Sequence, residues 1–366
     1  MKFLTRVLLI VSLLSTAVTR AQEPKSANKT ASEQDVETLK IDTNLVTVPV
    51  IARSRTGSYI ADLKTEEFKL TEDGVVQEIA FLASVDAPFY VVLMLDTSNS
   101  TKEKLPLIQR AAMDFVEQMG PNDKVKVISF DGQLCNWNDF TSDKTVLRSA
   151  ISKTRRGDGT RVYDALQLAL DSLDPIQQRK AIVLFTDGVD AYSERSSFES
   201  TVRNLDESGV IVYPIRYDTR VETEKMVQQQ VADINLGRMS RNPNPGTIGN
   251  PPPENKNISV RLDNSYLLAN DYLKKLADRS GGQLYRADNV ASLPKAFAAI
   301  AAELRTQYLL GYYPTNKSDN GAYRKIQVKT LRKDIAIRAR RGYRLKKAHS
   351  LFSRPTRSPL TMPRSS

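Results

Sequence analysis

The sequence predicts an α/β protein with a doubly wound, mostly parallel sheet and a smaller β-domain formed by N- and C-terminal strands. Three observations favour this fold class. From Tyr90 onward, segments typical of strands and of helices alternate along the chain. The strands in this part are nearly continuous apolar runs, which indicates that helices cover both faces of a parallel sheet. The segments before and after it are rich in β-branched residues or alternate in polarity, as strands do.

The first residues predict export. Basic residues flank the start of the apolar run 7–18, and small residues precede Gln22, as in a secretory signal peptide. The run is about 12 residues long, whereas a helix that spans a bilayer needs about 20. We therefore expect a signal peptide at 1–21 and a secreted or periplasmic protein with no transmembrane segment in the mature chain. A retained N-terminal anchor is the alternative.

The next segments predict a leader and a first β-unit. Residues 22–37 are polar and lack apolar periodicity, which predicts a disordered leader. Residues 38–88 form the expected N-terminal β-unit. Within it, 44–53 is β-branched and strand-like, and 68–82 contains two strands around a turn at Asp73 and Gly74.

The α/β part is expected to span residues 89–305. Its predicted strands are 90–96, 124–130, 180–187, 209–217 and 282–287. Its predicted helices, in which apolar residues recur three or four positions apart, are 102–119, 145–152, 161–173, 196–208, 270–280 and 293–307. Within this part, the stretch 220–260 contains a run rich in Pro, Asn and Gly, which predicts a long flexible insertion.

The chain after residue 305 is expected to return to β-structure. Residues 306–345 contain segments that alternate like strands, and we expect them to pair with the N-terminal unit. Residues 346–366 are basic and rich in Ser and Pro, which predicts a disordered tail in a chain of formal net charge +11. The basic residues grouped at this end are Arg338, Arg340, Arg341, Arg344, Lys346, Lys347 and Arg354. A solvated face with a soluble tail explains them, and a weak attraction to anionic envelope polymers is the alternative.

The composition excludes several classes of enzyme. The single histidine, His349, lies in the predicted tail, which excludes Ser-His-Asp and Cys-His catalysis and zinc sites built on histidine. The chain has no GxxxxGK motif and no strand-linked GxGxxG motif, so it lacks a phosphate cradle for nucleotides. The single cysteine, Cys135, cannot form an internal disulfide. We expect it to be buried and inert, with an intermolecular bridge or a reactive thiol as the alternatives.

Oxygen-bearing side chains follow two of the predicted strands. Asp96, Ser98 and Ser100 stand at every second position where the first of these strands ends, and Asp187 closes a later one. Thr160 lies in a glycine-containing turn just before a helix. Because ligands of open α/β sheets bind beyond the carboxyl ends of the strands, we expect the three loops to converge. Two carboxylates and three hydroxyls suit a hard divalent cation, Mg²⁺ or Mn²⁺, which stays able to accept one more anionic oxygen.

At these residues the chain from about Tyr90 to Leu304 resembles a von Willebrand factor A (VWA) domain. The runs VVLMLDTSNS, GDGT and FTDG match the metal-ion-dependent adhesion site (MIDAS) of that family. The overall architecture is similar to that of the VWFA-related domain proteins of Acidobacteria. That similarity depends on TEEFKLTEDGVVQEI before the domain and on YLLGYYP, YRKIQVKT and IRARRGY after it.

The resemblance implies a role for each residue of the site. Ser98 and Ser100 are implied to bind the ion directly. Asp96 and Asp187 are implied to bind it directly or through water. Thr160 is implied to join when a carboxylate of the ligand completes the coordination shell.

The sequence therefore predicts an exported binding protein rather than an enzyme. We expect it to bind a protein partner through the cation, with an Asp or Glu of the partner completing the site. No general base with a pKa near neutrality is apparent beside the site, as a catalytic metal centre usually has. A metal-assisted hydrolase and a structural envelope scaffold with an incidental ion are the alternatives. Nucleic acid is not an expected partner, because no aromatic–basic motif of the RNA-binding type is present.

Overall fold

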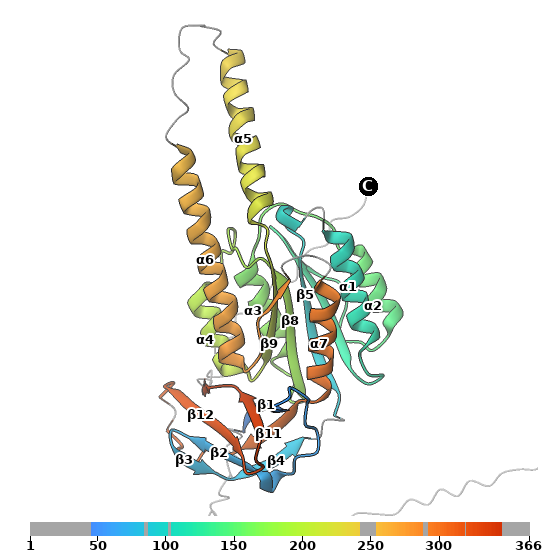
Figure 1. Ribbon diagram of the computed structural model, residues 1–366, viewed down its shortest axis with the longest axis vertical. Coiled ribbons are helices and arrows are strands. Elements are labelled where there is room, and N and C mark those ends of the chain that lie inside the picture. Colours follow the sequence, from blue (N-terminus) through green and yellow to red (C-terminus); the bar gives the residue numbers. More distant parts are fainter. Residues whose placement is uncertain are drawn as a thin grey trace, which may run out of the picture. The chain divides into compact units, whose positions relative to one another are not determined.

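The structure is a computed structural model that describes residues 45–83, 87–101, 104–241, 254–287, 292–318 and 320–345 (Figure 1). The chain divides into two units, Met1–Thr43 and Asn44–Ser366, and the described residues all belong to the second. The expected signal peptide, leader and basic tail, at 1–21, 22–37 and 346–366, lie outside the described residues. None of the described helices is both long and apolar enough to cross a membrane.

The central sheet has six strands in the order β10-β9-β8-β5-β6-β7. Their bounds are Tyr285–Ala287 for β10, Ile211–Tyr217 for β9, Arg179–Thr186 for β8, Phe89–Asp96 for β5, Lys124–Phe130 for β6 and Leu134–Asn136 for β7. All neighbouring pairs are parallel except β6 and β7, which are antiparallel. The predicted doubly wound, mostly parallel sheet is therefore confirmed.

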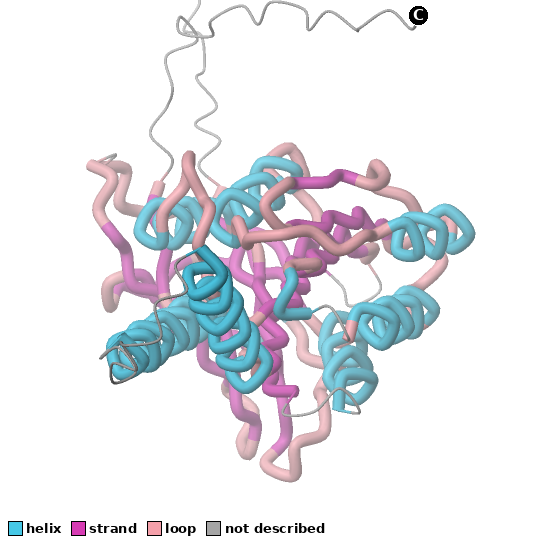
Figure 2. Tube along the Cα trace, turned by 90° about the horizontal axis from the view of Figure 1, so that it is seen from above, coloured by secondary structure: helices cyan, strands magenta, loops and turns pink. Residues whose placement is uncertain are grey.

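Helices cover both faces of this sheet (Figures 1 and 2). One face packs against α1 (Leu105–Glu117), α2 (Lys144–Lys153) and α7 (Leu293–Arg305), and the other against α3 (Val162–Leu173), α4 (Phe198–Ser208) and α6 (Glu254–Ser280). Side chains of a strand alternate between the two faces, so Val91 and Leu93 enter the first core while Val92 and Met94 enter the second. This double burial explains why β5 is apolar at every position from Val91 to Leu95.

The prediction of a flexible insertion across 220–260 is wrong for most of that stretch. Helix α5 spans Arg220–Arg241, and α6 begins at Glu254, well before the helix predicted at 270–280. Residues 242–253, which hold most of the Pro-rich run, lie outside the described residues. Helix α5 contains Glu, Lys, Gln and Met, which are good helix formers, but its polar composition favoured the prediction of a loop.

The remaining strands form two antiparallel sheets of a smaller β-domain. The sheet orders are β13-β1-β11-β4 and β14-β12-β2-β3. Their bounds are Ile335–Ala339 for β13, Val46–Ser54 for β1, Tyr308–Tyr312 for β11, Ile79–Ala83 for β4, Gly342–Arg344 for β14, Tyr323–Thr330 for β12, Phe68–Glu72 for β2 and Val75–Gln77 for β3. Strand β1 pairs with β11 and β13, and β2 pairs with β12. The predicted β-domain formed by N- and C-terminal strands is thus confirmed.

A buried carboxylate links this β-domain to α7. Glu303 of α7 has no exposed surface, and it forms ion pairs with Arg53 of β1, at 2.8 Å, and with Arg338 of β13. Tyr213 of β9 donates a hydrogen bond to the same carboxylate at 3.2 Å. A charge taken out of water needs such partners, so this cluster holds three parts of the chain together.

The expectation of a solvated basic face is wrong for Arg338 and Arg340. Arg338 pairs with buried Glu303, and Arg340 is 5% exposed and donates to the carbonyl oxygen of Gly342. Their long side chains point inward, because β13 and the residues after it lie against the α/β part. Of the basic residues grouped with the tail, Arg341 is the one within the described chain that is exposed.

Candidate metal site

The candidate site lies at the carboxyl edge of the central sheet. Strands β5 and β8 are parallel neighbours, and Leu95 pairs with Phe185 in their register. Asp96 ends β5 and Asp187 follows the last residue of β8, so adjacent strands deliver the two carboxylates to the same edge. Both are buried, with exposed fractions of 0% for Asp96 and 3% for Asp187.

Hydrogen bonds connect four of the five predicted ligands. The Asp96 Oδ1 atom accepts from the backbone N–H of Ser98 at 3.0 Å. The hydroxyl oxygens of Ser98 and Ser100 are 3.1 Å apart, and Ser100 donates to Asp187 Oδ2 at 3.1 Å. The loop after β5 includes a short 3-10 helix, Asn99–Thr101, whose turn brings the alternate hydroxyls to the same side. The structure therefore gathers Asp96, Ser98, Ser100 and Asp187 into one cluster.

Thr160 belongs to a loop that the backbone ties to the same edge. The N–H of Gly157 donates to the carbonyl oxygen of Thr97 at 3.0 Å, and the Thr160 carbonyl oxygen accepts from Ala191 and Tyr192. The Asn99 side chain also donates to Asp158 Oδ1 at 2.9 Å. The three predicted loops thus converge. Among the described residues, no hydrogen bond joins the Thr160 side chain to the other four ligands.

Two threonines support the carboxylates and were missed by the sequence prediction. Thr186 donates to Asp96 Oδ2 at 2.6 Å, and Thr219 donates to Asp187 Oδ2 at 2.5 Å. Thr219 also shares a hydrogen bond of 2.8 Å with the hydroxyl of Tyr266, on α6. Thr186 stands next to Asp187 in the sequence and could have been noticed. Thr219 and Tyr266 lie on either side of the stretch 220–260 and belong to none of the predicted strands or helices, so no local signal pointed to them.

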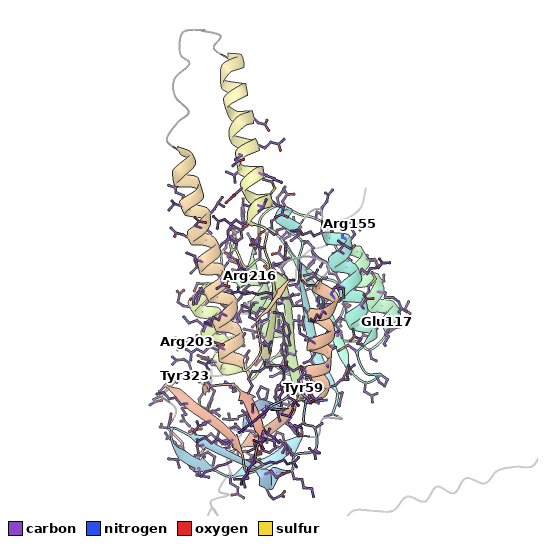
Figure 3. All side chains as sticks on the ribbon, viewed as in Figure 1. Tyr59, Glu117, Arg155, Arg203, Arg216 and Tyr323 are labelled. Atoms are coloured by element: carbon purple, nitrogen blue, oxygen red, sulfur yellow. The ribbon has the colours of Figure 1, made fainter. Side chains whose placement is uncertain are left out.

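Burial raises the pKa of both carboxylates, because it disfavours their charged forms. The pKa of Asp96 is raised from 3.8 to about 7, chiefly by burial and then by the charge of Asp187. Burial also raises the pKa of Asp187, although hydrogen bonds and the charge of Arg216 oppose this. Arg216 itself, labelled in Figure 3, donates to Asn270 of α6 at 2.9 Å. A cation between the two carboxylates would stabilise their charged forms.

The donor set fits a hard divalent cation. Two carboxylates and two hydroxyls lie together, with a third hydroxyl on a loop beside them, and every donor atom is oxygen. Within the described ranges, no group of three or more His, Cys, Asp or Glu residues forms an alternative metal cluster. Mg²⁺ and Mn²⁺ accept such oxygen ligands and commonly keep waters or an external ligand.

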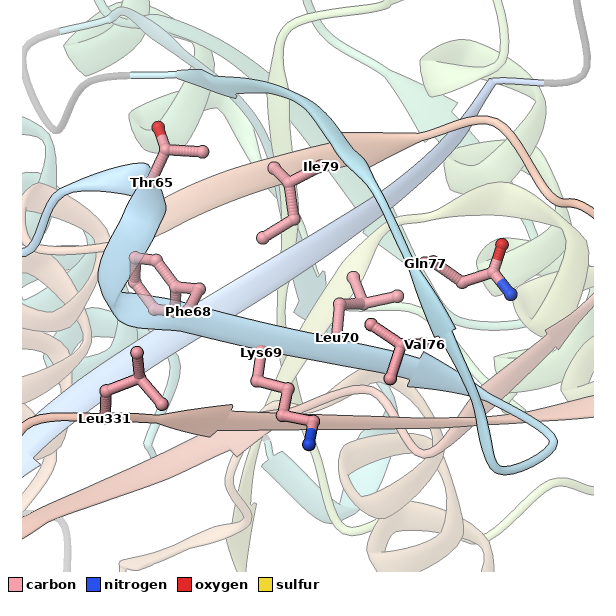
Figure 4. Close-up of a pocket in the computed structure, with 8 residues that line it drawn as sticks. All are labelled: Thr65, Phe68, Lys69, Leu70, Val76, Gln77, Ile79 and Leu331. Carbon is pink, nitrogen blue, oxygen red and sulfur yellow. The ribbon is translucent and has the colours of Figure 1, made fainter.

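Two further features of the chain lie outside this cluster. Asp164 of α3 accepts from the backbone N–H groups of Glu194, Arg195 and Ser196, which makes it a structural residue of the neighbouring loop. A cavity of about 430 Å³ in the β-domain is lined by residues such as Phe68 and by none of the five predicted ligands (Figure 4).

Comparison with known proteins finds a family model that matches part of this region. Residues 91–189 match the family model of the von Willebrand factor type A domain. The chain is 25% identical over 153 residues to the human von Willebrand factor A domain-containing protein 3B, a match that covers 40% of this chain. It spans 11% of the length of that relative.

Several solved structures match parts of the chain. BatB, a conserved hypothetical protein from Bacteroides thetaiotaomicron, is 20% identical with a TM-score of 0.39, covering 59% of this chain and 97% of that one. A von Willebrand factor type A protein from Catenulispora acidiphila is 11% identical with a TM-score of 0.44, and the match covers 74% of this chain and 70% of that one. Proximal thread matrix protein 1 from the mussel byssus is 15% identical with a TM-score of 0.42, and the match covers 63% of this chain and 48% of that one. That structure was solved with a zinc-occupied MIDAS motif.

Proposed function

The chain contains a von Willebrand factor type A domain, and from this premise we propose that it binds a protein partner through a divalent cation at a MIDAS. The ligands in this proposal are Asp96, Ser98, Ser100, Thr160 and Asp187. The ion is Mg²⁺ or Mn²⁺, and an Asp or Glu of the partner completes its coordination. The observation that carries the proposal is the hydrogen-bonded cluster of four of these side chains at the ends of β5 and β8.

The residues of the site contribute to ion binding in different ways. Asp96 and Asp187 supply the two negative charges that balance a divalent cation. Ser98 and Ser100 supply neutral oxygens, which coordinate without adding charge, so an anionic oxygen of the partner remains attractive to the ion. Thr186 and Thr219 hold the carboxylates in orientation, as second-layer hydrogen bonds do at metal sites.

The proposal includes export and the absence of catalysis. The apolar run 7–18 and the small residues before Gln22 support a signal peptide and a secreted or periplasmic location. None of the five proposed ligands is a histidine, and the ionisable ones are the two carboxylates that would hold the ion. Binding therefore accounts for the cluster better than metal-assisted hydrolysis does.

Affinity capture from an envelope extract tests the proposal. Wild-type protein with Mg²⁺ is expected to retain a partner that EDTA releases, and Asp96→Ala is expected to abolish retention. Thr160→Ala is expected to weaken retention while changing Mg²⁺ affinity less than Asp96→Ala does. The matched control is Asp139→Ala, because the Asp139 side chain is fully exposed and outside the site.

Three outcomes would count against this function. A partner that stays bound in EDTA would show that the ion is not needed. Equal retention by wild type, Asp96→Ala and Thr160→Ala would favour a scaffold with an incidental ion. Sustained Mg²⁺-dependent hydrolysis of a phosphoester or peptide, lost in Asp96→Ala, would favour the hydrolase alternative.

A further inference from the structure

A second cavity lies between α6 and the β-domain. Its volume is about 880 Å³, and its walls come from the end of α6, from the β2–β3 turn and from β12. Four of its lining side chains are cationic: Lys275, Arg279, Lys325 and Arg341. Asp73 is its acidic lining residue, and one oxygen of that carboxylate already accepts the backbone N–H of Lys325 at 2.8 Å.

The positive charges of this cavity are only partly compensated. Lys275 and Lys325 are exposed, and neither forms an ion pair with any residue that the structure describes. Arg341 approaches Asp278 at 3.9 Å, with 72% of its side chain exposed. Since unpaired cations in a concave surface raise the local concentration of anions, the cavity suits a negatively charged ligand.

A neighbouring cavity extends the same basic surface. It has a volume of about 370 Å³ and shares Lys275 and Arg279 with the first cavity. It adds Arg203 and Arg344, while its acidic residues are Glu199 and the buried Asp206. Arg203 and Tyr323 are labelled on this side of the molecule in Figure 3. The two cavities together form what we call the basic groove, with six cationic and three acidic lining residues.

Aromatic rings hold several of these cations in place. The Arg279 guanidinium lies 4.3 Å from the centre of the Tyr323 ring, and Lys275 Nζ lies 5.0 Å from that of Phe198. Arg279 also approaches Asp206 at 3.7 Å. A preorganised cation loses less conformational entropy on binding than a free one.

We propose that the basic groove binds an anionic polymer whose phosphate or carboxylate groups repeat along a flexible chain. The cationic side chains are spread along two connected cavities rather than converging on one point, which favours a repeating ligand over a single small anion. Arg203 and Arg344 of the second cavity pair with Glu207 and Asp206, so the charges left unpaired among the described residues are those of Lys275 and Lys325. This inference goes beyond the proposed metal-dependent function, because the groove contains none of the five metal ligands.

The test compares two double variants of the full chain. Lys275→Glu with Lys325→Glu reverses two charges inside the groove. Lys274→Glu with Lys329→Glu reverses two exposed charges on the same elements, α6 and β12, outside its lining. The probes are long-chain polyphosphate, polygalacturonate and inorganic phosphate, measured by calorimetry in EDTA at several salt concentrations.

The expected result is binding of a polymer by wild type and by the outer variant, with affinities within about twofold. The groove variant is expected to bind at least about tenfold more weakly, since reversing two charges inside the groove replaces attraction of the anionic polymer by repulsion. Binding of polyphosphate alone identifies a phosphate polymer, and binding of both polymers identifies a general polyanion site. Asp96→Ala is expected to bind the polymer as wild type does, which separates this test from that of the metal site.

Several results would overturn the inference. Equal losses in the two double variants would show an unspecific effect of net charge. Inorganic phosphate binding as tightly as polyphosphate would show a small-anion site instead. No binding of either polymer by wild type, with unchanged melting temperatures in all variants, would remove the proposed function of the groove.

Discussion

Asp96 is fully buried, yet the groups that donate hydrogen bonds to it are neutral, and the like charge of Asp187 acts on it. Its pKa is raised to about 7 for this reason. The sequence predicted Asp96 and its partners from their place at strand ends. It did not predict Thr219, because that residue comes from a helix start remote along the chain, and only the fold brings it to Asp187.

This raised pKa predicts how the stability of the metal-free protein depends on pH. Asp96 binds a proton more tightly in the folded state than in the unfolded state, where the pKa of its carboxyl group is near 3.8. The resulting stabilisation is complete below pH 3.8 and is lost as pH rises through about 7. The melting temperature in EDTA is therefore expected to fall across this range by more for wild type than for Asp96→Asn.

This pH dependence is checked by thermal melting monitored by circular dichroism, in the presence and in the absence of Mg²⁺. The ion is expected to raise the melting temperature of wild type more at pH 7.5 than at pH 5, because the carboxylates must be charged to bind it. At a Mg²⁺ concentration of one hundred times Kd the stabilisation would be about 2.7 kcal/mol. Identical dependence of the melting temperature on pH in wild type and Asp96→Asn would contradict the raised pKa of Asp96.

At the scale of the elements, α7 is fixed by a charge cluster and not by apolar packing alone. Glu303 contacts Arg53 and Arg338 on two strands of the β-domain. The sequence predicted this helix from its apolar spacing, but that spacing did not indicate a buried glutamate. Similarly, the apolar spacing of α5 is weak, so its polar residues suggested a loop. For α5, the local signal of a helix was helix propensity without a strong apolar stripe.

We expect Glu303→Ala to destabilise the protein by about 3–5 kcal/mol, because it leaves two arginines partly buried without their carboxylate partner. Glu117→Ala is the matched control on a helix. Glu117, labelled in Figure 3, pairs with Lys144 and Arg148 at the surface, and its loss is expected to cost less than about 1 kcal/mol. Urea unfolding measures both, and equal losses would refute a special role for the Glu303 cluster.

At the scale of the whole molecule, the alternation of strands and helices predicted the parallel sheet, and β-branched or alternating segments at both ends predicted the strands of the β-domain. The pattern of the sequence did not show that residues 335–345 form two strands that belong to different sheets. Strand β13 pairs with β1, and β14 pairs with β12. Between the two strands, Arg340 turns inward and donates to the carbonyl oxygen of Gly342, and that contact has no signature in the local sequence.

Removal of the C-terminal strands is expected to unfold the β-domain. A chain from Asn44 to Arg305 leaves β1 without its neighbours β11 and β13, and β2 without β12. Their apolar residues, such as Val48, Val50 and Leu70, would then face water. Such a chain is expected to give little soluble protein, whereas a chain from Asn44 to Leu345 should melt in a single transition. A soluble short chain with an unchanged melting temperature would contradict this.

The pairing of Val46 with Tyr312 also sets the order in which the molecule can be assembled. During synthesis, the first strand emerges long before its neighbours exist, and it stays without a partner while the central sheet forms. Closure of the β-domain is then the last folding event, since loops this long close slowly. In a chain cut short during translation the first strand would keep an open edge, so quality-control proteases and chaperones would meet an unpaired strand only in unfinished copies.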